Sequence, residues 1–308
     1  MRDAEITLAQ VAAFLAGLLL AGCSLAQIVV VATTAELRAL AIVVGGDAIR
    51  ASHLIPAGQD GETFQPRPRD MVQLREAQVV IRVGVDYDLW LDPLLRQSEN
   101  RAIRRGMPGY IDASRDIALL DIRAGGAGSG DGHAHGRGNP HYWLDPMNAE
   151  IITATILEAL ATIDPPNAKR YEANRLAFLA ELERRMDGWK RAFASATARA
   201  PHERAALIAH HDTWPYFARR FRLHFAGIIE PRAGVPPGPG HLASLARLPG
   251  IKAVVREPHE PMRDAQFIAT KTGAPVVILA SNVGVVPEAR DYLSLIDYNV
   301  RTLSQAIR

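Results

Sequence analysis

The residues best suited to binding a metal ion follow predicted strands and lie far apart in the chain. Glu62 lies in the loop after a predicted short strand at residues 52–55. His141 follows a glycine-rich segment at residues 125–138, with the sequence GGAGSGDGHAHGRG. Ligands of parallel α/β proteins bind beyond the carboxyl ends of the strands, so both side chains are expected at that edge of a sheet.

The second half of the chain offers a similar set of donors. His210 and His211 directly follow a predicted strand at residues 205–209. Glu257 and His259 follow the next but one predicted strand, and Ser281 and Asn282 follow the last. By the same rule these side chains should converge with those of the first half on one face of the molecule.

The donor types favour a metal site made of imidazole and carboxylate groups. These groups are good ligands for zinc, and manganese and iron are the alternatives. The chain has one cysteine, Cys23, which excludes an intrachain disulfide and a thiolate-rich zinc site. The chain also has ten histidines, and an isolated histidine is more often a surface or core residue than a ligand. From spacing alone, both interpretations stay open.

Strand and helix patterns alternate on both sides of one long helical segment. In the first half, β-branched or apolar runs predict strands at residues 28–33, 52–55, 77–83 and 117–120, and a helix at 34–44. In the second half, strands are predicted at 205–209, 225–229, 251–255 and 275–279, with helices near 213–221, 240–248, 261–272 and 288–307. This alternation is typical of α/β domains with mostly parallel sheets.

The segment 164–200 is predicted to be a single amphipathic helix. Asp164 can cap its first turn, and Pro165 suits the first helical position. Apolar residues then recur at spacings of three and four from Leu176 to Phe193. At 1.5 Å per residue the helix would span roughly 50 Å. We therefore expect two α/β lobes, residues 27–163 and 201–308, joined by this spine helix.

Composition and net charge favour a globular protein over a nucleic-acid-binding protein. The chain has 308 residues, of which 48% are hydrophobic, and this is enough for a substantial core. Its formal net charge of +2 gives no sign of a nucleic-acid-binding surface. The pattern therefore predicts a globular protein with no nucleic acid partner.

The first 26 residues are expected to be an export leader. The apolar run at residues 11–21 is shorter than the roughly 20 residues of a membrane span and matches a signal-peptide core. The sequence Leu20-Ala21-Gly22-Cys23 resembles a bacterial lipobox, in which the cysteine is lipidated and begins the mature chain. Cleavage after Ala26 is the alternative. Either route predicts a periplasmic or membrane-anchored location outside the cytoplasm.

Four segments resemble the metal-binding receptors of zinc and manganese ABC importers, the cluster A-I solute-binding family. The resemblance runs from about Val29 to the C-terminus. The segments are 56–70 (PAGQDGETFQPRPRD), 141–149 (HYWLDPMNA), 211–217 (HDTWPYF) and 255–258 (VREP), and the second is the most specific. Members of that family have two lobes joined by a long helix, bind their metal in the cleft between the lobes, and deliver it to a permease.

The resemblance implies a metal site formed by Glu62, His141 and His211. The two histidines match the family pattern directly, whereas Glu62 stands where a histidine is usual. The family usually has an aspartate where this chain has Ala280 or Ser281. Glu257 and His259 are therefore the candidates for a fourth ligand. Glu257 is expected to orient a ligand by a hydrogen bond, and a surface position is the default expectation for His259.

The resulting prediction is a monomeric receptor that supplies zinc, or less readily manganese, to the permease of an ABC importer. His133 and His135, in the glycine-rich segment, resemble a minimal form of the histidine-rich loop of some zinc receptors, and a plain linker is the alternative.

A zinc hydrolase is the main rival, because two histidines and one glutamate with an open position also form a catalytic pattern. The sequence contains neither an HExxH motif nor a nucleophile elbow, which favours a binding protein over an enzyme. An adhesin or sensor derived from a metal receptor is the second rival.

Overall fold

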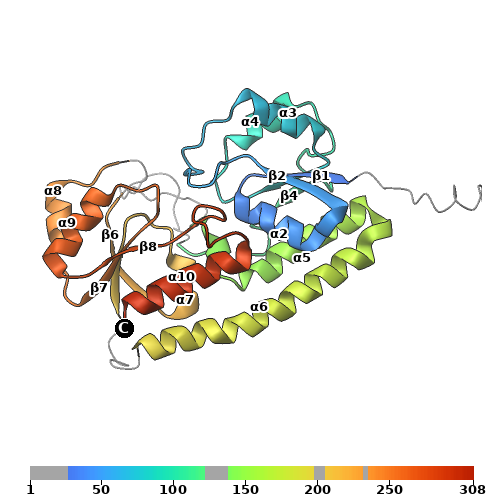
Figure 1. Ribbon diagram of the computed structural model, residues 1–308. Coiled ribbons are helices and arrows are strands. Elements are labelled where there is room, and N and C mark those ends of the chain that lie inside the picture. The colour runs from blue at the N-terminus through green and yellow to red at the C-terminus, as the bar shows by residue number, and fades with distance from the viewer. Residues whose placement is uncertain (1–26, 122–137, 198–204, 232–234) are drawn as a thin grey trace, which may run out of the picture.

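The chain folds into two α/β lobes that lie along one long helix (Figure 1). The computed structural model describes residues 27–121, 138–197, 205–231 and 235–308. The sheet of the first lobe has the order β2-β1-β3-β4, and all its pairs are parallel. Its strands are β1 (Ile28–Ala32), β2 (Ile49–His53), β3 (Val79–Arg82) and β4 (Tyr110–Asp112).

The second lobe repeats this arrangement. Its parallel sheet has the order β6-β5-β7-β8, so in both lobes the second strand lies on one side of the first strand and the third on the other. The strands are β5 (Ala206–Ala209), β6 (His224–Ile228), β7 (Ile251–Arg256) and β8 (Val276–Ile278). Such a reversal of strand order opens a crevice at the carboxyl ends of the strands, where ligands of α/β proteins bind.

Helices connect and cover the strands. In the first lobe they are α2 (Ala35–Gly45), α3 (Pro68–Glu76), α4 (Leu91–Gln97) and α5 (Asn148–Ile163), and in the second α7 (Pro215–Phe221), α8 (Pro239–Leu245), α9 (Met262–Thr272) and α10 (Tyr292–Ala306). Several begin at sequence signals: the Thr34 hydroxyl caps α2, and Asp291 and Ser294 form a capping box at the start of α10.

The predicted spine helix is α6 (Ala168–Thr197), which has 30 residues and is therefore about 45 Å long. It starts later than predicted, after a 3-10 turn at Pro165–Asn167. The Asp164 carboxylate does not cap the backbone. Instead it accepts hydrogen bonds from the Asn167 amide at 2.7 Å and the Tyr171 hydroxyl at 2.6 Å. Residues 198–200 lie outside the described part of the chain.

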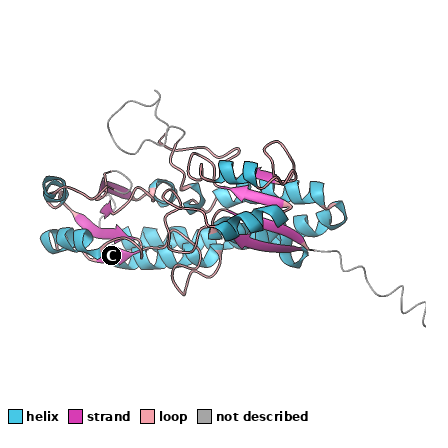
Figure 2. Cartoon of the chain, turned by 90° about the horizontal axis from the view of Figure 1, so that it is seen from above, coloured by secondary structure: helices cyan, strands magenta, loops and turns pink. Residues whose placement is uncertain are grey.

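One apolar core extends through both lobes, and the second lobe has a smaller cluster of its own. A single cluster of buried side chains includes residues of β1 and β3, of β5 and β7, and of the helices α6 and α10. Figure 1 shows α6 running along the length of the molecule beneath both lobes, and the view from above in Figure 2 shows the same elongated arrangement. Polar contacts add to this packing, because Asp297 of α10 accepts hydrogen bonds from Arg185 and from Trp189 of α6. The spine is therefore packed into the core and does not act as an exposed linker.

The structure corrects three local predictions. The strand predicted at 117–120 is wrong: the fourth strand of the first sheet is β4, at Tyr110–Asp112. The second strand begins earlier than predicted, at Ile49, because this register pairs it with β1. The last helix begins at Tyr292 and not near 288. Among the residues that the structure describes, no helix is both long and apolar enough to cross a membrane.

Candidate metal centre

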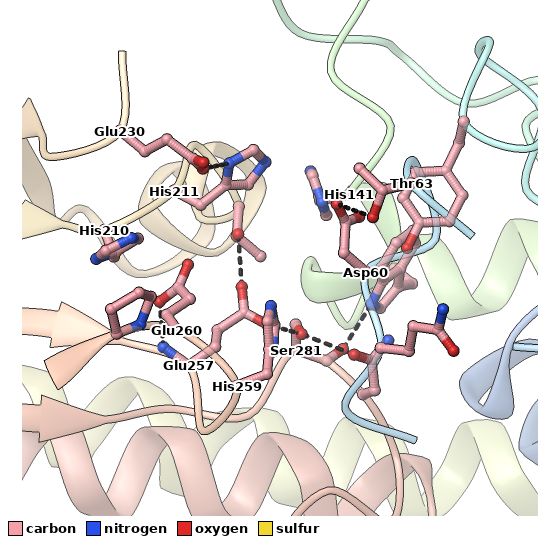
Figure 3. Close-up of a pocket in the computed structure, with 16 residues that line it drawn as sticks. Asp60, Thr63, His141, His210, His211, Glu230, Glu257, His259, Glu260 and Ser281 are labelled. Carbon is pink, nitrogen blue, oxygen red and sulfur yellow. Dashed lines mark hydrogen bonds and ion pairs between the residues drawn. The ribbon is translucent and has the colours of Figure 1, made fainter. Parts of the chain in front are cut away.

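Three predicted metal ligands meet between the lobes. Glu62 and His141 come from the first lobe and His211 from the second, and one donor atom of each lies within 4.8 Å of the others. The two imidazole rings face each other across the pocket, with centroids 5.7 Å apart and planes inclined at 74° (Figure 3). Donors this close can be drawn onto a common ion by small side-chain movements, since zinc–ligand distances are about 2.0–2.2 Å.

His141 is held by Asn139, two residues earlier. The amide oxygen of Asn139 accepts a hydrogen bond from the His141 backbone N–H at 3.0 Å and lies 3.1 Å from Nδ1 of the ring. Because an amide oxygen only accepts, Nδ1 must carry the ring hydrogen, and Nε2 is the nitrogen that can bind a metal. Tyr87 and Trp143 pack edge-on or tilted against the ring and limit its rotation.

His211 is held by Glu230. Nδ1 of His211 lies 2.9 Å from the Glu230 carboxylate, which leaves Nε2 to bind a metal. Burial lowers the pKa of His211, but the hydrogen bond to Glu230 and the negative charges of Glu62 and Glu257 outweigh it and raise the pKa to about 9. In the metal-free protein at neutral pH, His211 is therefore protonated.

Glu62 is positioned by a tight loop after β2. Its backbone N–H donates to Asp60 at 2.9 Å, and the Thr63 hydroxyl donates to the same carboxylate at 3.1 Å. The Trp90 indole donates to the carbonyl of Gly61 at 3.0 Å and fixes the loop to the first lobe. A Cβ atom at position 61 would lie 2.4 Å from the ring of Tyr87, so the close approach of the loop backbone to Tyr87 requires glycine at this position.

Glu257 does not join the three converging donors. Its Oε1 accepts a hydrogen bond from the Thr213 hydroxyl at 2.7 Å, and its Oε2 accepts one from Ser281. Nδ1 of His259 lies 3.9 Å from the same carboxylate, and its side chain is 32% exposed. Both carboxylate oxygens of Glu257 thus accept hydrogen bonds from hydroxyl groups at the cavity wall, and the predicted fourth-ligand role of Glu257 or His259 stays untested.

His141 and His211 line a small acidic cavity of about 200 Å³. Four carboxylic acids line it, and no lysine or arginine among the described residues does; the acids are Asp60, Glu230, Glu257 and Glu260. Burial and the neighbouring charge of Glu257 raise the pKa of Glu260 to about 9. The cavity is smaller than the roughly 300–1,000 Å³ of sites for organic ligands, and its charge favours a cation.

Comparison with known proteins identifies the family of this chain. A family model described as "Zinc-uptake complex component A periplasmic" matches residues 30–306. The chain belongs to this family. It is thus a substrate-binding protein of the metal ABC transporter type.

Relatives and solved structures agree with this assignment. The iron-binding protein YfeA of Yersinia pestis is 26% identical over 90% of this chain and 85% of its own length. The metal ABC transporter substrate-binding lipoprotein SloC of Streptococcus mutans is 21% identical, with coverages of 91% and 90%. A crystal structure of ZnuA superposes with a TM-score of 0.75 at 25% identity and covers 92% of this chain and all of that chain. The predicted family and the two-lobed fold are confirmed.

Sequence reasoning missed two residues that hold the imidazole rings of His141 and His211. Glu230 follows β6 closely, so the rule that located His211 and Glu257 could also have located it. Asn139 had no such signal, because its role depends on contacts that form only in the folded protein. His133, His135 and Cys23 lie outside the described residues.

Proposed function

We propose that this protein captures one zinc ion with Glu62, His141 and His211 and delivers it to the permease of an ABC importer. The observation that carries the proposal is the convergence of one carboxylate and two imidazoles from both lobes, with both imidazoles lining an acidic cavity. Family membership supports the transport role.

The donor set favours zinc among the transition metals. Two imidazoles and one carboxylate are usual zinc ligands, and a fourth position is left for water or another side chain. Both imidazoles are oriented by hydrogen bonds through Nδ1, an arrangement that fixes the tautomer of metal-binding histidines. Manganese and iron are the competitors, because relatives are named for iron as well as for zinc or metal uptake.

The site supports binding better than catalysis. A hydrolase with an open zinc position needs space for a substrate beside the ion. Here the cavity is about 200 Å³, and Ser281 and Glu257 bond to each other at its wall. We therefore propose that the ion is cargo and that the protein has no catalytic activity.

We also propose that the mature protein works outside the cytoplasm as a monomer. The family description names the periplasm, and several relatives are named as lipoproteins. If Cys23 carries lipid, the protein should partition into the membrane fraction and Cys23→Ala should release it. Mass spectrometry that finds an unmodified N-terminus at Gln27 would contradict lipidation.

Isothermal calorimetry of the metal-free protein with zinc, manganese, iron(II) and magnesium tests the metal. We expect one zinc per chain, bound more tightly than the other ions. His141→Ala should weaken zinc binding by several kcal/mol. His241→Ala is the matched control, because His241 bonds to the carbonyl of Ile228 and does not line the cavity. A protein that binds no divalent ion would refute the proposal.

A further inference from the structure

Asn139 joins the two segments that carry the metal-facing histidines. It is 2% exposed and lies between the lobes. Its side-chain oxygen contacts the backbone and ring of His141, as described above, and its amide nitrogen donates to the carbonyl of Asp212 at 2.8 Å. Asp212 directly follows His211, so a single carboxamide connects the two halves of the site.

The orientation of this amide is determined by its neighbours. A backbone N–H can only donate, so the group that faces His141 must be the oxygen of Asn139. A carbonyl can only accept, so the group that faces Asp212 must be the nitrogen. A flipped amide would lose both bonds.

Further contacts attach the same two segments to each other. The Tyr216 hydroxyl, on α7, donates to the carbonyl of Asn139 at 2.8 Å. On the other side of His141, the fully buried Asp145 accepts hydrogen bonds from Arg220 of α7 at 2.6 and 2.9 Å. The His141 segment is thus bonded to the segment after His211 on both of its sides.

We propose that Asn139 is a positioning residue that sets both imidazoles for the metal. Its oxygen holds His141 with the hydrogen on Nδ1, and its nitrogen holds the backbone next to His211. The two histidines then form a preassembled pair, to which Glu62 is added from a separate loop. This inference rests on the proposed metal site for its consequence, and on hydrogen bonds of the metal-free protein for its geometry.

Two substitutions separate the two contacts. Asn139→Ala removes both. Asn139→Asp keeps an acceptor for the His141 ring but puts a carboxylate oxygen against the carbonyl of Asp212. Asn100→Ala is the control, since the Asn100 amide also bonds to backbone groups, including the carbonyls of Leu74 and Ala77, but away from the cavity.

Three measurements test the proposal. Nitrogen-15 spectra of histidine-labelled metal-free protein should show His141 with its hydrogen on Nδ1 in the wild type and Asn139→Asp, and mixed tautomers in Asn139→Ala. Hydrogen exchange in residues 211–218 should accelerate in both variants. Zinc affinity should fall about 10–100-fold in Asn139→Ala, the usual effect of losing a hydrogen-bond partner of a ligand, and stay within twofold in Asn100→Ala.

Each measurement can overturn the proposal. It is wrong if wild-type His141 carries its hydrogen on Nε2, if exchange in residues 211–218 is unchanged in both variants, or if Asn100→Ala weakens zinc binding as much as Asn139→Ala. If Asn139→Ala does not fold, the wild-type spectrum and the exchange rates of Asn139→Asp still decide. Because both are measured without metal, they remain informative even if the wild type binds no zinc.

Discussion

Replacing Glu62 by alanine should weaken zinc binding far more than replacing Ser281. Glu62 supplies the only carboxylate among the three converging donors, whereas the Ser281 hydroxyl is bonded to Glu257. Structural zinc sites bind with about 10–16 kcal/mol, so one of three protein ligands accounts for roughly 3–5 kcal/mol. Since each 1.4 kcal/mol is a factor of ten, Glu62→Ala should lose about 10²- to 10⁴-fold in affinity.

The assay is zinc competition against a chelator of known affinity, at fixed pH. Glu62→Gln keeps the side-chain volume and removes the charge, so it should resemble Glu62→Ala. Ser281→Ala should cost less than about tenfold, because it removes one hydrogen bond from a carboxylate that retains Thr213. The reasoning is refuted if Glu62→Ala binds zinc as the wild type does, or if Ser281→Ala is equally harmful.

Three further predictions concern protons and stability. Because the pKa of metal-free His211 is about 9, zinc binding at pH 7 should release about one proton, and zinc affinity should rise up to about tenfold per pH unit between pH 7 and 9. Calorimetry in buffers of different ionisation enthalpy measures the number of protons released. Zinc binding without proton release would contradict this prediction. The pKa of Glu260 is raised from 4.5 to about 9, so its contribution to stability is present below pH 4.5 and lost as the pH rises through 9. Glu260→Gln should therefore raise the melting temperature of the metal-free protein at pH 9 and change it little at pH 5, and an equal change at both values would exclude this cause. Asp145→Ala should destabilise the fold by about 3 kcal/mol in urea unfolding, because Asp145 is fully buried against Arg220; a loss under about 1 kcal/mol would show that the pair contributes little.

The sequence predicted the fold well because its signals are local. Val29 to Val31 form a β-branched run, and they lie in β1 as expected. Strand-end rules and the resemblance together located His141 and His211. The failures have a different cause. The apolar segment at residues 117–120 resembles a strand, but the edge position beside β3 is taken by β4, which pairs Ile111 with Ile81. Propensity does not decide between two such segments, whereas pairing in the sheet does.

The hydrogen-bond partners of the site were harder to predict than its ligands. A histidine directly after a strand indicates a possible metal ligand, but the order of residues does not predict that Glu230 faces Nδ1 of His211. The same holds for Asn139 and Asp212, which are 73 residues apart. Such pairs depend on how the two lobes pack on their shared core, and sequence patterns carry little information about that packing.

The charges of the cavity explain how an acidic pocket can stay stable without metal and still attract a divalent ion. Buried carboxylates repel one another, and in the metal-free protein protons on His211 and Glu260 offset part of that repulsion. A divalent ion that binds Nε2 of His211 must displace one proton, so the site loses one positive charge and gains two. The net gain of one charge faces Glu62 and the neighbouring acids at short range and in a partly desolvated setting, where such attraction is strong. Lowering the pH restores protons to the same nitrogen. Release of the ion should therefore become easier wherever the pH falls below that of capture.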